Sequence, residues 1–154
     1  MTFAIALLIV ALGMIYSVIN FIVKFNTGYS LDFNYLDLLG RIFISLLFLF
    51  NGYFKIINYD GTLEWMEGYG VPGIFLTPAI ILEIAAPLMV IIGYKTKIAA
   101  ALLSVFCLTT ALVFHTDFAN QVQISSFLKN IGLAGGFLFI VVNGPKRFSI
   151  DNKK

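Results

Sequence analysis

Charged residues are scarce in this chain. They make up 12% of its 154 residues, about half the share of a typical soluble domain, while hydrophobic residues make up 60%. This composition excludes an ordinary soluble globular fold and indicates an integral membrane protein. The formal net charge is only +2, and the basic residues lie at the ends of apolar segments rather than in a patch, so no nucleic-acid partner is expected.

Cysteine and histidine are almost absent. The chain has one of each, Cys107 and His115. A single cysteine excludes an intrachain disulfide and a CxxC dithiol, and its place in an apolar segment predicts a small core residue. A single histidine excludes a haem held by two histidines of this chain, and the sequence has no flavin or iron–sulfur motif. We therefore expect no intrinsic cofactor and no metal site.

Long apolar segments are what the chain has in abundance. They cover residues 3–23, 38–57, 73–94, 98–114 and 127–143. Segments of about 20 apolar residues predict transmembrane helices, so the predicted fold class is all-α, a polytopic membrane helical bundle. The first segment lacks the basic flank and the clear cleavage site of a secretory signal, which favours a retained helix over a cleaved one. Between the segments we expect a surface linker at residues 24–37 and a short interfacial helix at about residues 62–67.

The charges are distributed unevenly between the two ends of these segments. One set is basic and comprises Lys24, Lys95, Lys97, Lys146, Arg147, Lys153 and Lys154, with Arg41 close by. The other set is acidic and comprises Asp60, Glu64, Glu67 and Asp117. The positive-inside rule places the basic set in the cytoplasm. The N-terminus is then predicted outside and the C-terminus in the cytoplasm, which five spans require.

Glu83 is the most unusual residue, because it lies near the middle of the third apolar segment. A carboxylate there costs roughly 2.5–3.5 kcal/mol on insertion scales, which the apolar residues around it offset. Pro87, four residues later, leaves the Glu83 carbonyl without its helical hydrogen bond. We expect Glu83 to face the bundle interior and to be satisfied by Lys129 or His115. If Lys129 extends outward to the headgroups instead, His115 or Asn51 is the expected partner.

Other polar residues lie in the same outer half of the predicted bundle. The candidate ligand-binding or proton site comprises Glu83, His115, Lys129, Asn130, Asn51 and Lys55. Intramembrane ionisable residues are functional candidates, although a Glu83–Lys129 pair that only holds two helices together remains an alternative. Taken singly, Arg41 and Lys55 are expected to extend to the headgroups.

Small residues predict where helices pack closely. Gly132 and Gly136 form a GxxxG pattern with Gly135 beside them, which indicates a helix–helix contact in a membrane. Pro87 is expected to shape the packing of the third span.

An ordered set of short motifs resembles the DoxX family. The first half of the family pattern is seen in Gly40-Arg41, Asn51-Gly52 with Lys55, and Gly70-Val71-Pro72. The second half is seen in Glu83, Gly93, Phe114-His115, Phe127-Leu128-Lys129-Asn130, Gly135-Gly136, Gly144-Pro145, Ser149 and Asp151. The resemblance covers about residues 40–151, which is most of the chain.

DoxX-like proteins are bacterial membrane proteins with four helices, related to small subunits of thiosulfate:quinone oxidoreductase, and some belong to oxidative-stress and detoxification complexes. The resemblance implies a four-helix domain at residues 38–151, a tail at 152–154, and a location in the bacterial cytoplasmic (inner) membrane. It also implies a redox system that uses quinone. Two features depart from the family: the segment at residues 3–23 is an additional helix, and Ala86-Pro87 stands where glycine usually follows the glutamate.

Three functional classes remain open. The first is a small membrane subunit of a redox system, at most part of a quinone-linked oxidoreductase, which binds quinone or a similar apolar ligand near Glu83, His115 and Lys129. Its electrons would come from a partner protein, since the chain has no redox motif of its own. The second is a non-catalytic scaffold or accessory subunit of a larger membrane complex. The third is a small proton-linked transporter, against which the single buried acid and the lack of a repeat argue.

Overall fold

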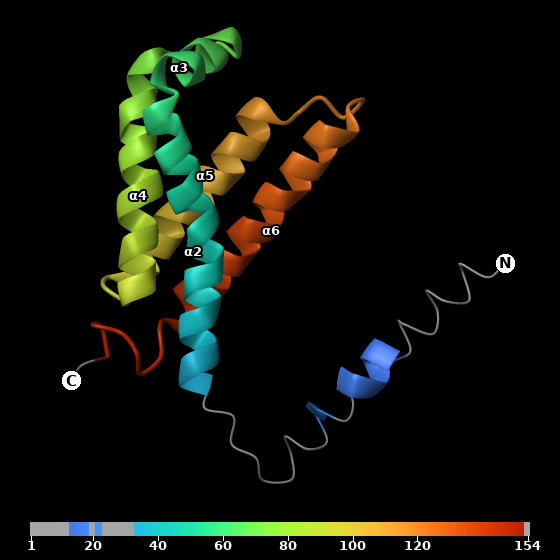
Figure 1. Ribbon diagram of the computed structural model, residues 1–154, viewed down its shortest axis with the longest axis vertical. Helices are drawn as coiled ribbons and strands as arrows, with labels where there is room; N and C mark the ends of the chain where they lie inside the picture. Colours follow the sequence, from blue (N-terminus) through green and yellow to red (C-terminus); the bar gives the residue numbers. More distant parts are fainter. Residues whose placement is uncertain (1–12, 19–20, 23–32, 153–154) are drawn as a thin grey trace, which may run out of the picture. The chain divides into compact units, whose positions relative to one another are not determined.

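The computed structural model describes residues 13–18, 21–22 and 33–152, and these residues form helices and no strand (Figure 1). The elements are α2 (Phe33–Ile57), α3 (Tyr59–Gly68), the 3₁₀ turn η1 (Gly73–Phe75), α4 (Leu76–Ile92), α5 (Thr96–Phe114) and α6 (Gln121–Asn143). Among the described residues, four stretches are long and apolar enough to cross a membrane: Phe33–Ile57, Gly73–Ile92, Thr96–Phe114 and Gln121–Asn143. The predicted all-α membrane bundle is confirmed.

The chain divides into two units, residues 1–33 and 34–154. Most of the predicted first span, residues 3–23, lies outside the described residues; residues 13–18 and 21–22 are helical. The additional transmembrane helix therefore stays a prediction.

Four of the described helices begin earlier than predicted, α3 and α5 by two or three residues and α2 and α6 by more. Helix α2 begins at Phe33, so the last part of the expected surface linker is helical, and Asp37 accepts a hydrogen bond from Arg41 one turn later at 3.0 Å. Helix α6 begins at Gln121 instead of residue 127, because the Asn120 side chain caps it by accepting from the Val122 N–H. Residues 121–126 are mostly polar, so hydropathy did not predict that α6 extends over them. The interfacial helix is also longer than expected.

The core is built from small residues on α5 that let two neighbouring helices approach. Ala99, Ala100, Leu103 and Cys107 are completely buried there, which confirms the predicted core position of Cys107. The Ser104 hydroxyl donates to the carbonyl of Ala134 on α6 at 3.1 Å. Close approach of this kind is how helices associate in a membrane without a large hydrophobic gain.

The predicted glycine contact is only partly found. A Cβ at Gly136 would overlap Ile44 of α2, so this position does lie in a helix contact. Gly132 and Gly135 have open space beside them within the described part of the chain. The reason is helix rotation: Ala134 and Phe137 are the buried positions of α6, so the face carrying Gly132 points away.

Arg41 is buried, and the expectation that it extends to the headgroups was wrong. Its side chain is 1% exposed. The guanidinium donates to the carbonyls of Val90 (3.0 Å), Ile91 (2.8 Å) and Phe148 (2.6 Å), and to Asp37. The last carbonyls of a helix have no partner within it, and a guanidinium with five donors satisfies several at once. Arg41 thus joins α2, the end of α4 and the C-terminal segment, residues 144–152.

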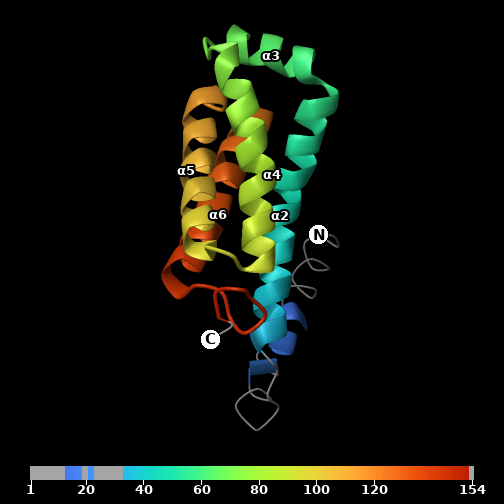
Figure 2. The ribbon, with the colours of Figure 1, turned by 90° about the vertical axis from the view of Figure 1, so that its left-hand side faces the viewer.

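The C-terminal segment completes this end of the bundle (Figure 2, red). The Asp151 carboxylate accepts from the backbone N–H groups of Lys95 (2.8 Å) and Thr96 (2.9 Å) and from the Thr96 hydroxyl (2.7 Å). The slight burial of Asp151 raises its pKa, but these hydrogen bonds and the Arg41 charge outweigh burial, and the pKa is lowered overall. Gly93, with φ of 72°, ends α4, and a Cβ there would overlap Ser149. The segment is therefore part of the fold.

Candidate functional site

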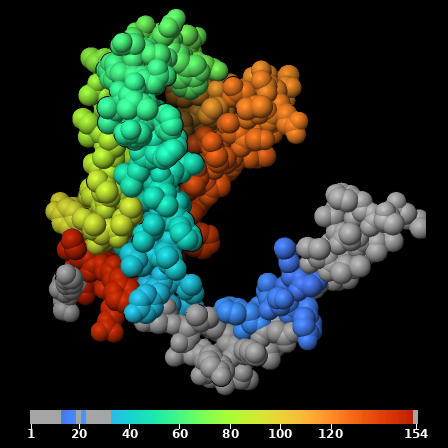
Figure 3. Space-filling model, viewed as in Figure 1, coloured from blue at the N-terminus to red at the C-terminus, as the bar shows by residue number. Residues whose placement is uncertain are grey.

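A cavity of about 320 Å³ opens at the other end of the bundle, where α3 and the α5–α6 connection lie. The surface is indented between the α2–α3 end and the start of α6 (Figure 3). The lining residues are Leu47, Phe48, Asn51, Phe54, Lys55, Asn58, Thr62, Trp65, Glu83, Phe106, Thr110, Phe114, His115, Lys129 and Asn130. All six candidate residues of the sequence analysis line this one cavity.

Helix α4 turns Glu83 inward because of its spacing along the helix. The buried positions recur every three or four residues on one face, and they are Leu76, Ile80, Glu83, Ala86, Pro87 and Val90. Glu83 belongs to that face, and its side chain is 3% exposed. The expectation that Glu83 faces the interior is confirmed.

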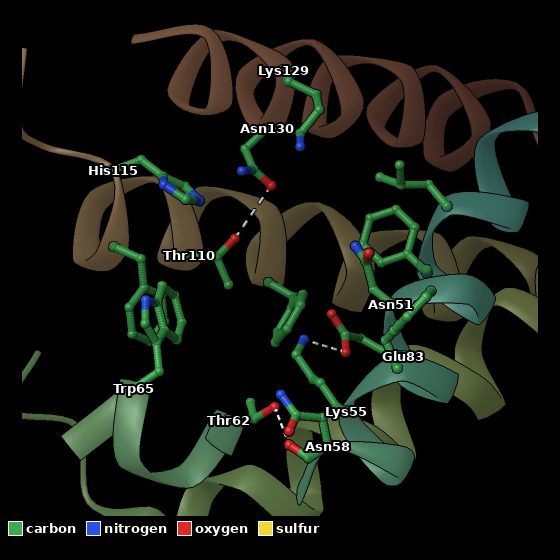
Figure 4. Close-up of a pocket in the computed structure, with 15 residues that line it drawn as sticks. Asn51, Lys55, Asn58, Thr62, Trp65, Glu83, Thr110, His115, Lys129 and Asn130 are labelled. Carbon is green, nitrogen blue, oxygen red and sulfur yellow. Dashed lines mark hydrogen bonds and ion pairs between the residues drawn. The ribbon is translucent and has the colours of Figure 1, made fainter. Parts of the chain in front are cut away.

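The partner of Glu83 is Lys55, and the expected partners Lys129 and His115 were wrong. The Lys55 Nζ lies 2.5 Å from the Glu83 Oε2 (Figure 4). Lys55 is 24% exposed, so it also does not extend to the headgroups as expected. The cause is Gly52, where α2 and α4 come so close that a Cβ would overlap Ile84. Lys55 follows on the same face of α2 and reaches the carboxylate directly.

His115, Lys129 and Asn130 line the opposite side of the cavity, on α6 and at the end of α5, whereas Asn51 lies on α2 with Lys55 (Figure 4). His115 Nδ1 lies 2.7 Å from Gln123 Oε1. Asn130 donates to the Ser126 carbonyl at 3.0 Å and faces the Thr110 hydroxyl at 3.4 Å. Lys129 is exposed, points its nitrogen toward the cavity, and has no hydrogen-bond or ion-pair partner among the described residues.

Aromatic side chains form the rest of the wall. Trp65 of α3 stacks on Phe114 of α5, with ring centroids 4.6 Å apart and an angle of 26° between the planes. The Lys55 ammonium lies 5.8 Å from the centre of the Phe106 ring, within the range of a cation–π contact. The cavity therefore offers flat apolar surfaces beside charged and amide groups.

Sequence reasoning missed several lining residues. Trp65 falls in the segment expected to be an interfacial helix, and its role as a wall depends on contact between α3 and α5. Phe106 and Thr110 were not singled out and Phe114 was named only in the family resemblance, although the spacing of four residues places all three on one face of α5. That periodicity, which ends next to His115, is the signal from which they could have been predicted. The described residues include no group of three His, Cys, Asp or Glu side chains able to hold a metal ion.

Comparison with known proteins identifies a matching family model and two similar bacterial inner membrane proteins. A family model described as DoxX matches residues 36–116. The inner membrane protein YqjF of Escherichia coli (strain K12) is 41% identical over 120 residues, which cover 76% of this chain and 92% of YqjF. The inner membrane protein YphA of the same organism is 31% identical over 123 residues, which cover 75% of this chain and 88% of YphA.

A more distant relative is eukaryotic. The Surfeit locus protein 4 homolog of Schizosaccharomyces pombe is 31% identical over 128 residues, covering 78% of this chain but only 38% of that protein. No solved structure matches the chain. The similarity to the two bacterial proteins therefore extends over most of each chain, while the yeast protein has much additional sequence.

Proposed function

The chain belongs to the DoxX family of integral membrane proteins, and on that basis we propose that it is a small membrane subunit of a redox system that binds a quinone or a similar flat apolar ligand in the cavity. Its place is the bacterial inner membrane, as the names of its relatives suggest. The cavity end faces outward and the basic end, with Lys95, Lys97, Lys146 and Arg147, faces the cytoplasm.

The observation that carries this proposal is the combination of a buried ion pair and stacked aromatic rings in one cavity. About 320 Å³ lies within the range of small-molecule sites, which are mostly apolar with a few polar groups. A quinone has a flat ring, which suits the Trp65–Phe114 stack and Phe106. It also has two carbonyl oxygens, which need donors such as Lys55 and the Asn51 amide.

Electrons for such a ligand come from a partner protein in this proposal, because the sequence has no redox motif. The residues of the chain bind the ring and supply hydrogen bonds to its oxygens. The Lys55–Glu83 pair keeps a proton and its acceptor within the cavity, where reduction of a quinone consumes protons.

Direct extraction tests the proposal. The full chain, purified in mild detergent from quinone-containing membranes, is extracted with organic solvent, and bound quinone is quantified by chromatography. We expect bound quinone in the wild-type chain. The amount should fall at least about threefold in Asn51→Leu, which removes one amide donor from the cavity.

The matched control is Asn143→Leu, the same change at an exposed asparagine near the opposite end of α6. It should leave the bound quinone unchanged. A wild-type chain that carries no quinone and does not bind an added short-chain quinone would contradict the proposal.

A scaffold or accessory role is the second candidate, and one observation favours it. Packing within the described chain leaves Gly132 and Gly135 of α6 open, although glycine faces are typical of helix contacts in membranes. This face then receives a helix of another subunit. Gly132→Leu should remove a co-purifying membrane protein while leaving bound quinone unchanged. Retention of the co-purifying protein in this variant would contradict the scaffold role.

A further inference from the structure

The cavity has more positive than negative charge. This excess favours a negatively charged ligand, an inference that rests on the proposed function of the cavity as a ligand site. Two lysines and one carboxylate line it. Lys55 already neutralises Glu83 in the ion pair. The charge of Lys129 remains, since no acidic side chain lies within ion-pair distance of it in the described part of the chain.

Lys129 is also placed to use that charge on a ligand. It is exposed at the cavity, so water satisfies it when the cavity is empty and the fold does not depend on its pairing. Its nitrogen points toward the cavity from α6, across from the Lys55–Glu83 pair (Figure 4).

A neutral donor adds to the same preference. The Asn51 amide lines the cavity and has no partner among the described residues, so its N–H groups are available to an anionic oxygen. The one carboxylate of the cavity is held by Lys55, so the wall offers donors and positive charge more than competing negative charge.

We propose that the cavity selects flat aromatic ligands that carry an acidic group ionised at neutral pH. Lys129 holds the anionic oxygen, and the ring lies against Trp65 and Phe106. A ligand with the same ring but no charge binds more weakly, because it leaves the Lys129 ammonium in water and gains only neutral hydrogen bonds.

Trp65 allows this to be measured directly, since it is the only tryptophan of the chain and lines the cavity. The full chain in an uncharged detergent is titrated at pH 7 with 2-hydroxy-1,4-naphthoquinone, an anion, and with 2-methoxy-1,4-naphthoquinone, its neutral counterpart. Quenching of Trp65 fluorescence reports binding, and Trp65→Phe gives the background. We expect the anionic probe to bind about tenfold more tightly.

Charge variants identify the group responsible. Lys129→Gln should weaken the anionic probe about tenfold and the neutral probe less than about twofold, whereas Lys129→Arg should retain the difference. The matched control, Lys146→Gln, removes an exposed lysine at the opposite end of the bundle and should change neither affinity. Equal affinity for the two probes, unaffected by Lys129→Gln, would overturn the inference and leave the quinone proposal standing.

A third probe tests whether the cavity binds an aromatic acid even if it does not bind quinone. Binding of 2-naphthoate that depends on Lys129, with no binding of either naphthoquinone, would support an aromatic acid and contradict quinone. Absence of binding by all three probes would overturn both. In nanodiscs of phosphatidylcholine, loss of the anionic probe when phosphatidylglycerol is added would assign the site to a lipid headgroup and overturn the aromatic ligand.

Discussion

The Lys55–Glu83 pair illustrates how single charged residues are accommodated in this bundle. Each charge alone would be costly at its depth, but together they form a short ion pair beside a cavity that water can enter. Arg41 achieves the same result with backbone carbonyls and Asp37. Both basic residues were expected to extend outward, because sequence position alone places them near helix ends.

Breaking the ion pair should cost more than removing it. In Lys55→Gln the Glu83 carboxylate loses its cation, and we expect the apparent free energy of unfolding in detergent to fall by about 3 kcal/mol. The double variant Lys55→Gln/Glu83→Gln leaves no unpaired charge and should recover much of this loss. Thermal unfolding followed by circular dichroism measures both. A double variant less stable than Lys55→Gln would show that the pair is not what stabilises this position.

Helix ends depend on contacts with distant parts of the chain. The start of α5 is capped by Asp151, more than fifty residues away in sequence, and by no side chain of its own first turn. The end of α4 is bonded to Arg41 and to the backbone of residues 150 and 151. The C-terminal segment thus acts as a cap shared by two helices.

This cap should depend on pH. Because the pKa of Asp151 is lowered in the fold, its contribution is fully present above the ordinary aspartate pKa of about 3.9 and is lost as pH falls through the lowered value. Protection of the Lys95 and Thr96 amides against hydrogen exchange, taken relative to the intrinsic rate at each pH, should therefore fall below about pH 4 in the wild-type chain. Asp151→Asn should show lower protection already at neutral pH, with little further loss of protection on acidification.

The control for this experiment is Asp60→Asn, which changes an exposed carboxylate at the opposite end of the bundle. It should exchange like the wild-type chain. Identical exchange of Asp151→Asn and wild type at pH 7 would mean that the carboxylate does not hold the segment.

In the described four-helix unit, most of the charged residues between helices differ in sign from one end to the other. The end with the C-terminal segment carries Lys95, Lys97, Lys146 and Arg147, beside the paired Asp37 and Asp151. The end with the cavity carries Asp60, Glu64 and Glu67 on α3 and Asp117 in the α5–α6 connection, beside Lys55 and Lys129 in the cavity. This separation supports the predicted orientation, in which the cavity end is outside.

Labelling of single cysteines tests the orientation. In a Cys107→Ser background, cysteines at the exposed positions Glu64 and Thr116 should react with an impermeant reagent added to intact cells. A cysteine at Lys146, equally exposed at the other end, should react only after the membrane is permeabilised. The reverse pattern would place the cavity on the cytoplasmic side.

The four-helix unit should be stable without the segment before it. Deleting residues 1–32 removes nearly all of the first unit and leaves α2 intact, so this truncated chain should accumulate in the membrane, as measured by immunoblot. Deleting residues 1–37 also removes Asp37, which accepts from Arg41 and from the Lys146 backbone, and should reduce accumulation further. Complete degradation of the shorter deletion would show that the first segment is required for the fold.

The sequence by itself determined the membrane class, the approximate positions of the four described spans and six of the polar residues that line the cavity. These properties depend on neighbouring residues: a span follows from a run of apolar side chains matched to bilayer thickness. The inward position of Glu83 also followed, because a carboxylate turned to lipid is too costly at that depth.

Only the tertiary structure decided which charges meet. The partner of Glu83 depends on how closely α2 and α4 approach at Gly52, and the direction of Arg41 depends on where the C-terminal segment docks. The open face at Gly132 depends on how α6 is rotated about its axis. Approach, docking and rotation are relations between helices, set by the packing of the whole bundle, and hydropathy along one segment does not contain them.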